Sequence, residues 1–230
     1  ETKPASVHLI YLDPPFCSAA SYYQQTKLGD QHLQLTAYED HWSIDDYLQF
    51  MYERLLLLRE LLKDTGSIFL HCDNHQSHHL RCLLDEVFGA KQFRNEIIWH
   101  YTGGGRSKRN FSRKHDNIFW YSKTEKWTFN IDAIRVPYKP TSGYAKNGIK
   151  AANGKLYKPN PKGTPVDDTW DIPIINPMAK ERVGYPTQKP LPLLNRIIAA
   201  ASNPGDTILD PFLGSGQVAV VGKMLDRRFC

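Results

Sequence analysis

Apolar positions along the chain recur either at helical spacing or in short continuous runs. The helical spacing predicts four helices, over residues 44–63, 75–88, 192–202 and 217–225. At the start of the first helix, Ser43 is a suitable N-cap residue and Asp46 follows three residues later. Gly66 lies just beyond the expected end of that helix, where glycine commonly terminates helices.

The short apolar runs predict strands that alternate with these helices. They cover residues 7–12, 67–72, 95–101, 117–123 and 206–210. Alternation of short apolar strands with helices is typical of a mostly parallel sheet covered on both faces. The sequence therefore predicts an α/β fold.

Between residues 124 and 185 the periodic pattern is lost among Gly, Pro, Lys, Asn and Tyr. We interpret this segment as an irregular insertion. It divides the chain into segments 1–123, 124–185 and 186–230.

Length and composition narrow the class of protein. A chain of 230 residues buries a substantial core, and no apolar run approaches the roughly 20 residues that cross a membrane. The first residues show no secretory signal, and the four cysteines form no disulfide framework. These features predict a cytoplasmic location.

The net charge of +5 conceals a strong asymmetry. Residues 102–163 hold 14 Lys and Arg against 3 Asp and Glu, so the rest of the chain is acidic. A solvated lysine-rich loop gives the same balance, but the interleaved Tyr, Trp and Phe favour a nucleic-acid partner. The residues expected to contact the DNA backbone are Arg106, Lys108, Arg109, Arg113 and Lys114.

Two of the expected strands end in the same way, with Asp-Pro and an aromatic residue. Asp13-Pro14-Pro15-Phe16 follows the first strand and Asp210-Pro211-Phe212 follows the last. Ligands of open α/β sheets bind beyond the carboxyl ends of the strands. Gly214 and Gly216 then let a ligand approach the backbone, at a helix start with unpaired N–H groups.

These motifs and their order resemble a known family. "LDPPF", "YPTQKP" and "LDPFLGSG" are similar to motifs of the amino-methylating DNA methyltransferases, in the beta-class order with the catalytic tetrapeptide first. "TGSIFLHCD" and "FRNEIIWHY" resemble segments of adenine-directed members. The resemblance covers nearly the whole chain outside residues 124–180. It implies a Rossmann-like methyltransferase fold and S-adenosylmethionine as cofactor.

The resemblance also implies the roles of the first motif. The Asp13 carboxylate and a backbone carbonyl of the Pro14-Pro15 turn would accept the two N–H bonds of a base amine. The freed lone pair would then attack the sulfonium methyl group. Phe16 would stack on the base after it flips out of the duplex, which is worth roughly 1–3 kcal/mol.

The cofactor-binding residues carried over from the family belong to the second and third motifs. They are Thr187, Gln188, Lys189, Pro190, Asp210, Pro211, Phe212, Gly214, Ser215 and Gly216. By the same resemblance, residues 1–123 form the catalytic half, 124–185 the DNA target recognition region and 186–230 the cofactor-binding half. Within the target recognition region, Tyr138, Tyr144, Tyr157 and Trp170 are candidate base contacts.

The family pattern continues past both ends of this chain. An acidic residue that binds the cofactor ribose normally follows the glycine-turn helix, but the sequence stops at "RRFC", and twelve residues precede Asp13. We expect a chain clipped at both ends. Its uncovered surface would favour association, such as a homodimer.

A metal site is the alternative suggested by "HCDNHQSHHLRC". Its Cys72, His75, His78, His79 and Cys82 are divided between a strand and a helix, and we expect no metal.

The sequence thus predicts an adenine-directed DNA methyltransferase acting on double-stranded DNA, with a restriction endonuclease as its functional partner and no membrane association. Asp at position 13 favours adenine, because cytosine-directed members more often have Ser there. Cytosine-N4 methylation and a non-catalytic DNA-binding relative or fragment are the alternatives.

Overall fold

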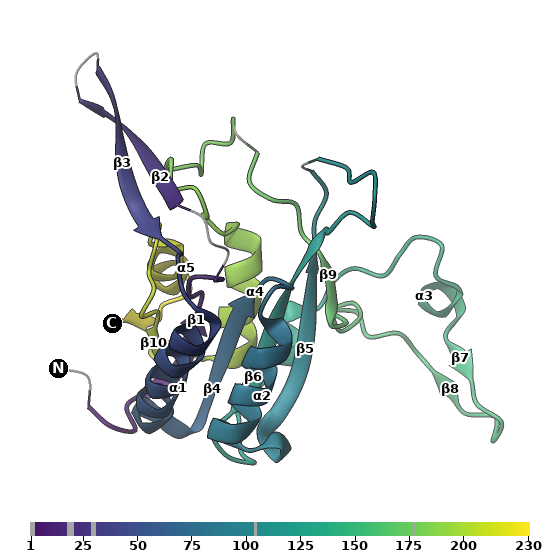
Figure 1. Cartoon of the computed structure of the whole chain (residues 1–230). Helices are drawn as coiled ribbons and strands as arrows, with labels where there is room; N and C mark the ends of the chain where they lie inside the picture. The colour runs from purple at the N-terminus through teal and green to yellow at the C-terminus, as the bar shows by residue number, and fades with distance from the viewer. Residues whose placement is uncertain (1–2, 18–20, 29–30, 104, 177) are drawn as a thin grey trace.

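The computed structural model describes residues 3–17, 21–28, 31–103, 105–176 and 178–230. Within these ranges, seven strands form one sheet in the order β11-β10-β1-β4-β6-β5-β9 (Figure 1). Their bounds are β1 Val7–Leu12, β4 Leu62–Cys72, β5 Phe93–His100, β6 His115–Ser122, β9 Thr169–Asp171, β10 Thr207–Leu209 and β11 Arg228–Phe229. In this sheet β6 runs against both neighbours and every other pairing is parallel. The mostly parallel sheet expected from the sequence is confirmed.

Helices cover both faces of the sheet. The longer ones are α1 Ile44–Leu61, α2 Ser77–Phe88, α4 Leu191–Ala201 and α5 Gln217–Met224. Ile10 and Leu12 of β1 pack in the core with α1 and α2, whereas Leu9 and Tyr11 pack in the core with α4 and α5. This alternation follows from the strand period of two. Figure 1 shows α1 and α2 side by side against one face.

The start of α1 is as the sequence predicts. The Ser43 hydroxyl accepts a hydrogen bond from the Asp46 amide at 3.1 Å. Gly66, however, lies inside β4 rather than at a helix end, because the chain passes from α1 directly into the strand at Leu62. A Cβ on Gly66 would lie 2.9 Å from the Lys63 carbonyl oxygen and 3.2 Å from that of His8. Glycine at this position allows β1 and β4 to approach closely.

A hairpin that the sequence pattern did not predict joins the first motif to α1. It consists of β2 Ser21–Leu28 and β3 Gln31–Glu39, which pair antiparallel and project from the body (Figure 1).

The segment after β6 forms short elements rather than a periodic domain. They are the 3₁₀ helix η2 Ile131–Ile134, α3 Gly143–Asn147, β7 Ile149–Lys150 and β8 Leu156–Tyr157; another 3₁₀ helix, η1 Ala90–Gln92, precedes β5. Both ends of the segment are attached to the body, through Asn130, which bonds to carbonyls at the end of α4, and through β9, which pairs with β5.

Trp170 on β9 is buried in the core, so the expectation that it contacts a base is wrong. Its neighbours in sequence include the acids Asp167 and Asp168, and its indole N–H donates to the carbonyl of Asp167. Tyr138, Tyr144 and Tyr157 remain candidates, and Tyr157 is the most exposed of these with about half of its surface accessible. No helix in the described ranges is long and apolar enough to cross a membrane.

We predict that Gly222→Ala destabilises the protein. A Cβ on Gly222 of α5 would lie 2.5 Å from Cδ1 of Ile208, which is buried in β10. Overpacking of this kind costs about 1–3 kcal/mol, and at a contact this short the cost should exceed the roughly 1 kcal/mol that alanine gains in a helix. The melting temperature should therefore fall. Gly105→Ala is the control, because a Cβ there meets no atom within 4 Å. Equal melting temperatures for the two variants would contradict the close packing of α5 on β10.

Candidate active site

The two Asp-Pro motifs meet because β1 and β10 are parallel neighbours. Leu9 lies opposite Ile208 and Ile10 opposite Leu209, so Asp13 and Asp210 emerge from the same edge of the sheet. On its other side β1 pairs with β4, which follows it in the chain. This is a topological switch point, where α/β sheets place their ligands.

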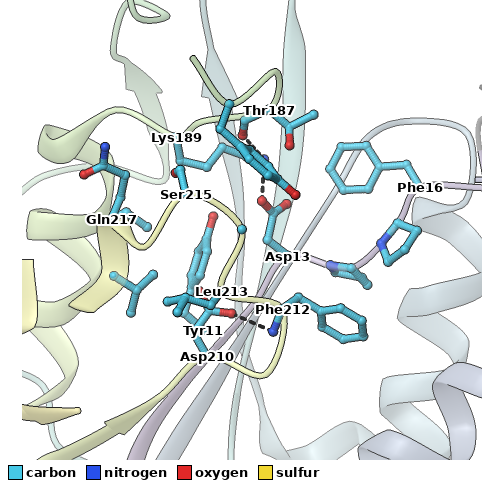
Figure 2. A pocket seen from close by; sticks show the side chains of 16 residues that line it. Tyr11, Asp13, Phe16, Thr187, Lys189, Asp210, Phe212, Leu213, Ser215 and Gln217 are labelled. Carbon is cyan, nitrogen blue, oxygen red and sulfur yellow. Dashed lines mark hydrogen bonds and ion pairs between the residues drawn. The ribbon is translucent and has the colours of Figure 1, made fainter. Parts of the chain in front are cut away.

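A cavity of about 380 Å³ opens between the two motifs (Figure 2). Ten of the residues expected in the site line it: Asp13, Pro14, Pro15, Phe16, Thr187, Lys189, Asp210, Phe212, Gly214 and Ser215. It is also lined by residues that the motifs did not point to: Tyr11, Tyr185, Leu194, Leu213, Gln217 and Val218. The cavity thus joins the expected catalytic and cofactor-binding residues in one space.

Four expected residues shape the site without lining the cavity. The side chain of Gln188 accepts a hydrogen bond from the Val183 amide at 2.9 Å and donates one to the Glu181 carbonyl at 2.6 Å, which closes the preceding loop. Pro190 precedes the first residue of α4, Gly216 precedes the first residue of α5, and Pro211 is exposed. These four residues therefore lie next to cavity-lining residues in the sequence but do not line the cavity themselves.

Asp13 is paired with Lys189, across 176 residues of sequence. The Lys189 ammonium lies 2.5 Å from Asp13 Oδ2 and 5.4 Å from the centre of the Phe16 ring. Asp13 Oδ1 is buried and accepts no hydrogen bond from the described residues. Lys189, expected beside the cofactor, thus pairs with one carboxylate oxygen of Asp13, which lines the cavity, and the other oxygen has no donor among the described residues (Figure 2).

Asp210 has a different environment from Asp13. Its carboxylate is buried and accepts a hydrogen bond from the Phe212 amide at 3.0 Å. Burial, with a smaller contribution from the negative charge of Asp13, raises the pKa of Asp210 to about 7. A cationic ligand group beside Asp210 would favour its ionised form.

The turn after Asp210 has glycines at two positions, so no side chain covers its backbone there. Gly214 and Gly216 have φ angles of +55° and +79°, which favour glycine. A Cβ on Gly214 would lie 3.3 Å from the Tyr185 ring. No side chain of the described residues caps the start of α5, so its first N–H groups suit an anionic ligand group.

A buried polar chain that the motifs did not reveal lies beneath the first motif. The Tyr11 hydroxyl is 2.7 Å from His71 Nδ1, and His71 Nε2 is 3.1 Å from Asp116, which also accepts from Tyr101 at 3.0 Å. Burial alone would raise the pKa of Asp116, but the hydrogen bond and charge of His71, with Lys189 and Tyr101, lower it overall. His71 also contacts the Phe16 ring at a centroid distance of 6.0 Å. The floor under Phe16 is therefore fixed by hydrogen bonds.

The basic loop is largely exposed. Arg106, Lys108 and Arg109 are free to meet solvent, whereas Arg113 lies 3.0 Å from His75 Nε2. The Lys114 ammonium is bonded to the carbonyls of Gly103 and Gly105, so this lysine folds the loop as well as contributing charge. Their contact with DNA stays a prediction.

The histidines of the second helix are dispersed. His75 pairs with Asp73, which also accepts the His75 amide at 2.9 Å, and the rings of His78 and His79 lie beside each other. Among the described residues, no group of three His, Cys, Asp or Glu is placed to hold a metal ion.

Comparison with known proteins agrees with this fold. A family model described as DNA methylase, N6_N4_Mtase, matches residues 7–230. The Type II methyltransferase M.HpaI of Haemophilus parainfluenzae is 32% identical over 223 residues, covering 96% of this chain and 62% of its own length. The DNA adenine methyltransferase YhdJ of Escherichia coli K12 is 30% identical, over 97% of this chain and 70% of its own. This chain therefore spans about three fifths of the length of M.HpaI.

Two solved structures share the fold. The PvuII DNA methyltransferase, described as cytosine-N4-specific, matches with a TM-score of 0.64 and 16% identity, over 98% of this chain and 74% of its own. A complex of M1.HpyAVI with S-adenosylmethionine matches with a TM-score of 0.58 and 22% identity, over 97% and 80%.

The sheet, the helices on both faces and the ligand cavity at the switch point define a Rossmann-like methyltransferase fold. The chain belongs to the N6_N4_Mtase family of DNA methylases. The resemblance seen in its motifs is confirmed, and S-adenosylmethionine, the cofactor expected from the sequence, agrees with this family.

The raised pKa of Asp210 predicts a pH effect on stability. The carboxyl binds a proton up to about pH 7 in the folded chain but only up to about pH 4 when unfolded, so the unfolding free energy falls as pH rises through this window. Asp210→Asn keeps an acceptor for the Phe212 amide and removes this loss. We expect the variant to gain stability relative to the wild type between pH 5 and pH 8, by on the order of 1–4 kcal/mol. Chemical denaturation at pH 5 and pH 8 measures the unfolding free energy of the wild type and the variant. A difference between the two proteins that is the same at both pH values would contradict the burial of an ionisable Asp210.

Proposed function

We propose that this chain transfers a methyl group from S-adenosylmethionine to the exocyclic amine of adenine in double-stranded DNA. The target base is flipped into the cavity at the first motif, and the cofactor binds at the glycine turn. Sequence choice is assigned to the region of residues 124–185, and phosphate contacts to the basic loop. A restriction endonuclease with the same recognition sequence is the proposed functional partner.

The observation that carries this proposal is the hydrogen bonding of the Asp13 carboxylate. Its buried Oδ1 has no hydrogen-bond donor among the described residues, and a buried acceptor of this kind costs free energy unless a ligand satisfies it. An amine N–H is a suitable donor. The ammonium of Lys189 on Oδ2 orients the carboxylate, and Phe16 provides an aromatic face at the same end of the cavity.

The other end of the cavity suits the amino-acid part of the cofactor. The buried carboxyl of Asp210 matches an ammonium group, and the uncapped start of α5 matches a carboxylate. Because Gly214 has no side chain, a ligand can approach its backbone beside the Tyr185 ring. S-adenosylmethionine supplies the methyl group when bound. The residues of the chain hold the two reactants on opposite sides of one cavity and align them.

Adenine is favoured over cytosine by Asp13 and by similarity to YhdJ, whose name gives adenine as its target. Cytosine-N4 methylation is the second candidate, because the PvuII enzyme shares the fold. Incubation of unmethylated phage DNA with the protein and isotope-labelled cofactor, followed by nucleoside digestion and mass spectrometry, identifies the product. N6-methyl-2′-deoxyadenosine supports the proposal, and N4-methyl-2′-deoxycytidine means that the target is cytosine. Unlabelled DNA overturns the methyltransferase activity of this chain.

Asp13→Ala should abolish methyl transfer, because the amine loses its carboxylate acceptor. Affinity for DNA, measured by fluorescence anisotropy, should change little. The melting temperature should fall, because the buried Lys189 ammonium is left without its carboxylate. Phe16→Ala should cost less, since stacking worth roughly 1–3 kcal/mol is lost while the hydrogen bonds remain. Transfer by Asp13→Ala at a rate near that of the wild type would refute the assigned role.

Replacing Arg106 and Arg109 with Ala should weaken binding to every DNA sequence alike. Each lost phosphate contact should flatten the plot of log affinity against log salt by about 0.9. Lys223→Ala together with Lys63→Ala is a control of equal charge outside the basic loop. An unchanged slope in the loop variant would mean that the basic loop is a solvated surface.

A further inference from the structure

Asp40 is a buried acid that none of the motifs includes. It lies between the end of β3 and the start of α1, and its side chain is inaccessible to solvent. Its carboxylate accepts hydrogen bonds from two consecutive backbone amides, Phe16 N at 3.2 Å and Cys17 N at 3.0 Å. A carboxylate buried in this way binds its N–H donors strongly.

These two amides are the first that follow Asp13, because Pro14 and Pro15 have none. A trans peptide group is planar, with its N–H and C=O pointing in opposite directions, and the described chain has no cis peptide bond. The bond from Phe16 N to Asp40 therefore directs the Pro15 carbonyl away from Asp40. The bond from Cys17 N does the same for the Phe16 carbonyl.

The backbone at Cys17 needs this support. Its φ angle is +55°, an uncommon conformation for a residue with a side chain. The Cys17 thiol contacts the Trp42 carbonyl at 3.6 Å, and the Trp42 ring packs on Phe50 of α1 at a centroid distance of 4.8 Å. The turn that carries Phe16 is thus anchored to the start of α1, with Asp40 as its charged contact.

We propose that Asp40 is a positioning residue for methyl transfer. It sets the peptide planes of the catalytic tetrapeptide, and through them the carbonyl acceptors of the turn and the direction of the Phe16 ring. This inference rests on the proposed function, because it assigns Asp40 a part in presenting the target amine.

Asp40→Asn tests the proposal, since the amide side chain keeps the size of the acid but offers one acceptor oxygen in place of two. Misplacement of reacting groups by about 1 Å costs on the order of 100-fold in rate, so we expect kcat to fall by about that factor. S-adenosylmethionine affinity, measured by calorimetry, should stay within about threefold, because Asp210 and the glycine turn are untouched. Asp85→Asn is the matched control: Asp85 on α2 accepts a hydrogen bond from the Tyr121 hydroxyl at 2.6 Å, outside the cavity.

A double-mutant cycle separates positioning from general destabilisation. In a Phe16→Ala background, Asp40→Asn should lower kcat by a smaller factor than in the wild type, because the effect through the ring is absent while the effect through the carbonyls remains. Asp85→Asn should have the same small effect in both backgrounds. Equal effects of Asp40→Asn in the two backgrounds would overturn the positioning of the Phe16 ring. A kcat like that of Asp85→Asn would overturn the proposal as a whole. Absence of transfer by the wild type would instead refute the proposed function.

Hydrogen exchange in the wild type provides a test that needs no variant to fold. The amides of Phe16 and Cys17 should exchange far more slowly than that of Lys108 in the exposed loop. Exchange as fast as that of Lys108 would contradict the two hydrogen bonds to Asp40 and with them the proposal. If Asp40→Asn does not fold, Asp40→Glu replaces it, because it keeps the charge but displaces the carboxylate and should show the same loss of kcat with unchanged cofactor affinity.

Discussion

The parallel pairing of β1 with β10 is the constraint on which the site depends. It joins segments almost 200 residues apart, and it places Asp13 and Asp210 at one edge of the sheet. Without it, the tetrapeptide and the glycine turn would share no cavity. The pairing is maintained by cores on both faces, since Ile10 packs with α1 and α2 while Leu9 and Ile208 pack with α4 and α5. A contact of such long range is slow to form, and its stability comes from this apolar packing on both sides.

Much of the fold could be predicted from local patterns. The strand at residues 7–12, the cap at Ser43 and the glycine turn after Asp210 each depend on neighbours in the sequence. Gly66 shows the limit of such reasoning, because the same residue that ends many helices here allows two strands to approach. The hairpin of β2 and β3 was predictable in principle, because the sequence has Gly29-Asp30 between the two strands and such a pair is typical of a two-residue hairpin turn.

The candidate site was predictable where motifs carry it and not where distant side chains meet. Ten motif residues line the cavity. The partners of those residues were missed: Lys189 reaches Asp13 across 176 positions, Asp40 reaches Phe16 across 24, and His71 reaches Asp116 across 45. The periodicity of apolar residues indicates which face of an element is buried. It does not indicate which polar side chains from distant segments form hydrogen bonds or ion pairs with each other. Trp170 shows a different error. It lies in an irregular segment, which favoured an exposed contact residue, but the structure buries it in the core.

The two carboxyl groups in the cavity differ because their surroundings differ. Asp13 has the Lys189 ammonium on one carboxylate oxygen, and its other oxygen accepts no hydrogen bond from the described residues. Asp210 has a single backbone amide, and burial raises its pKa to about 7. An acid in that state is stabilised by an incoming positive charge, whereas Asp13 already has one. In the proposed function, an aspartate at one end of the cavity accepts a hydrogen bond from the target amine. An aspartate at the other end binds the ammonium group of the cofactor.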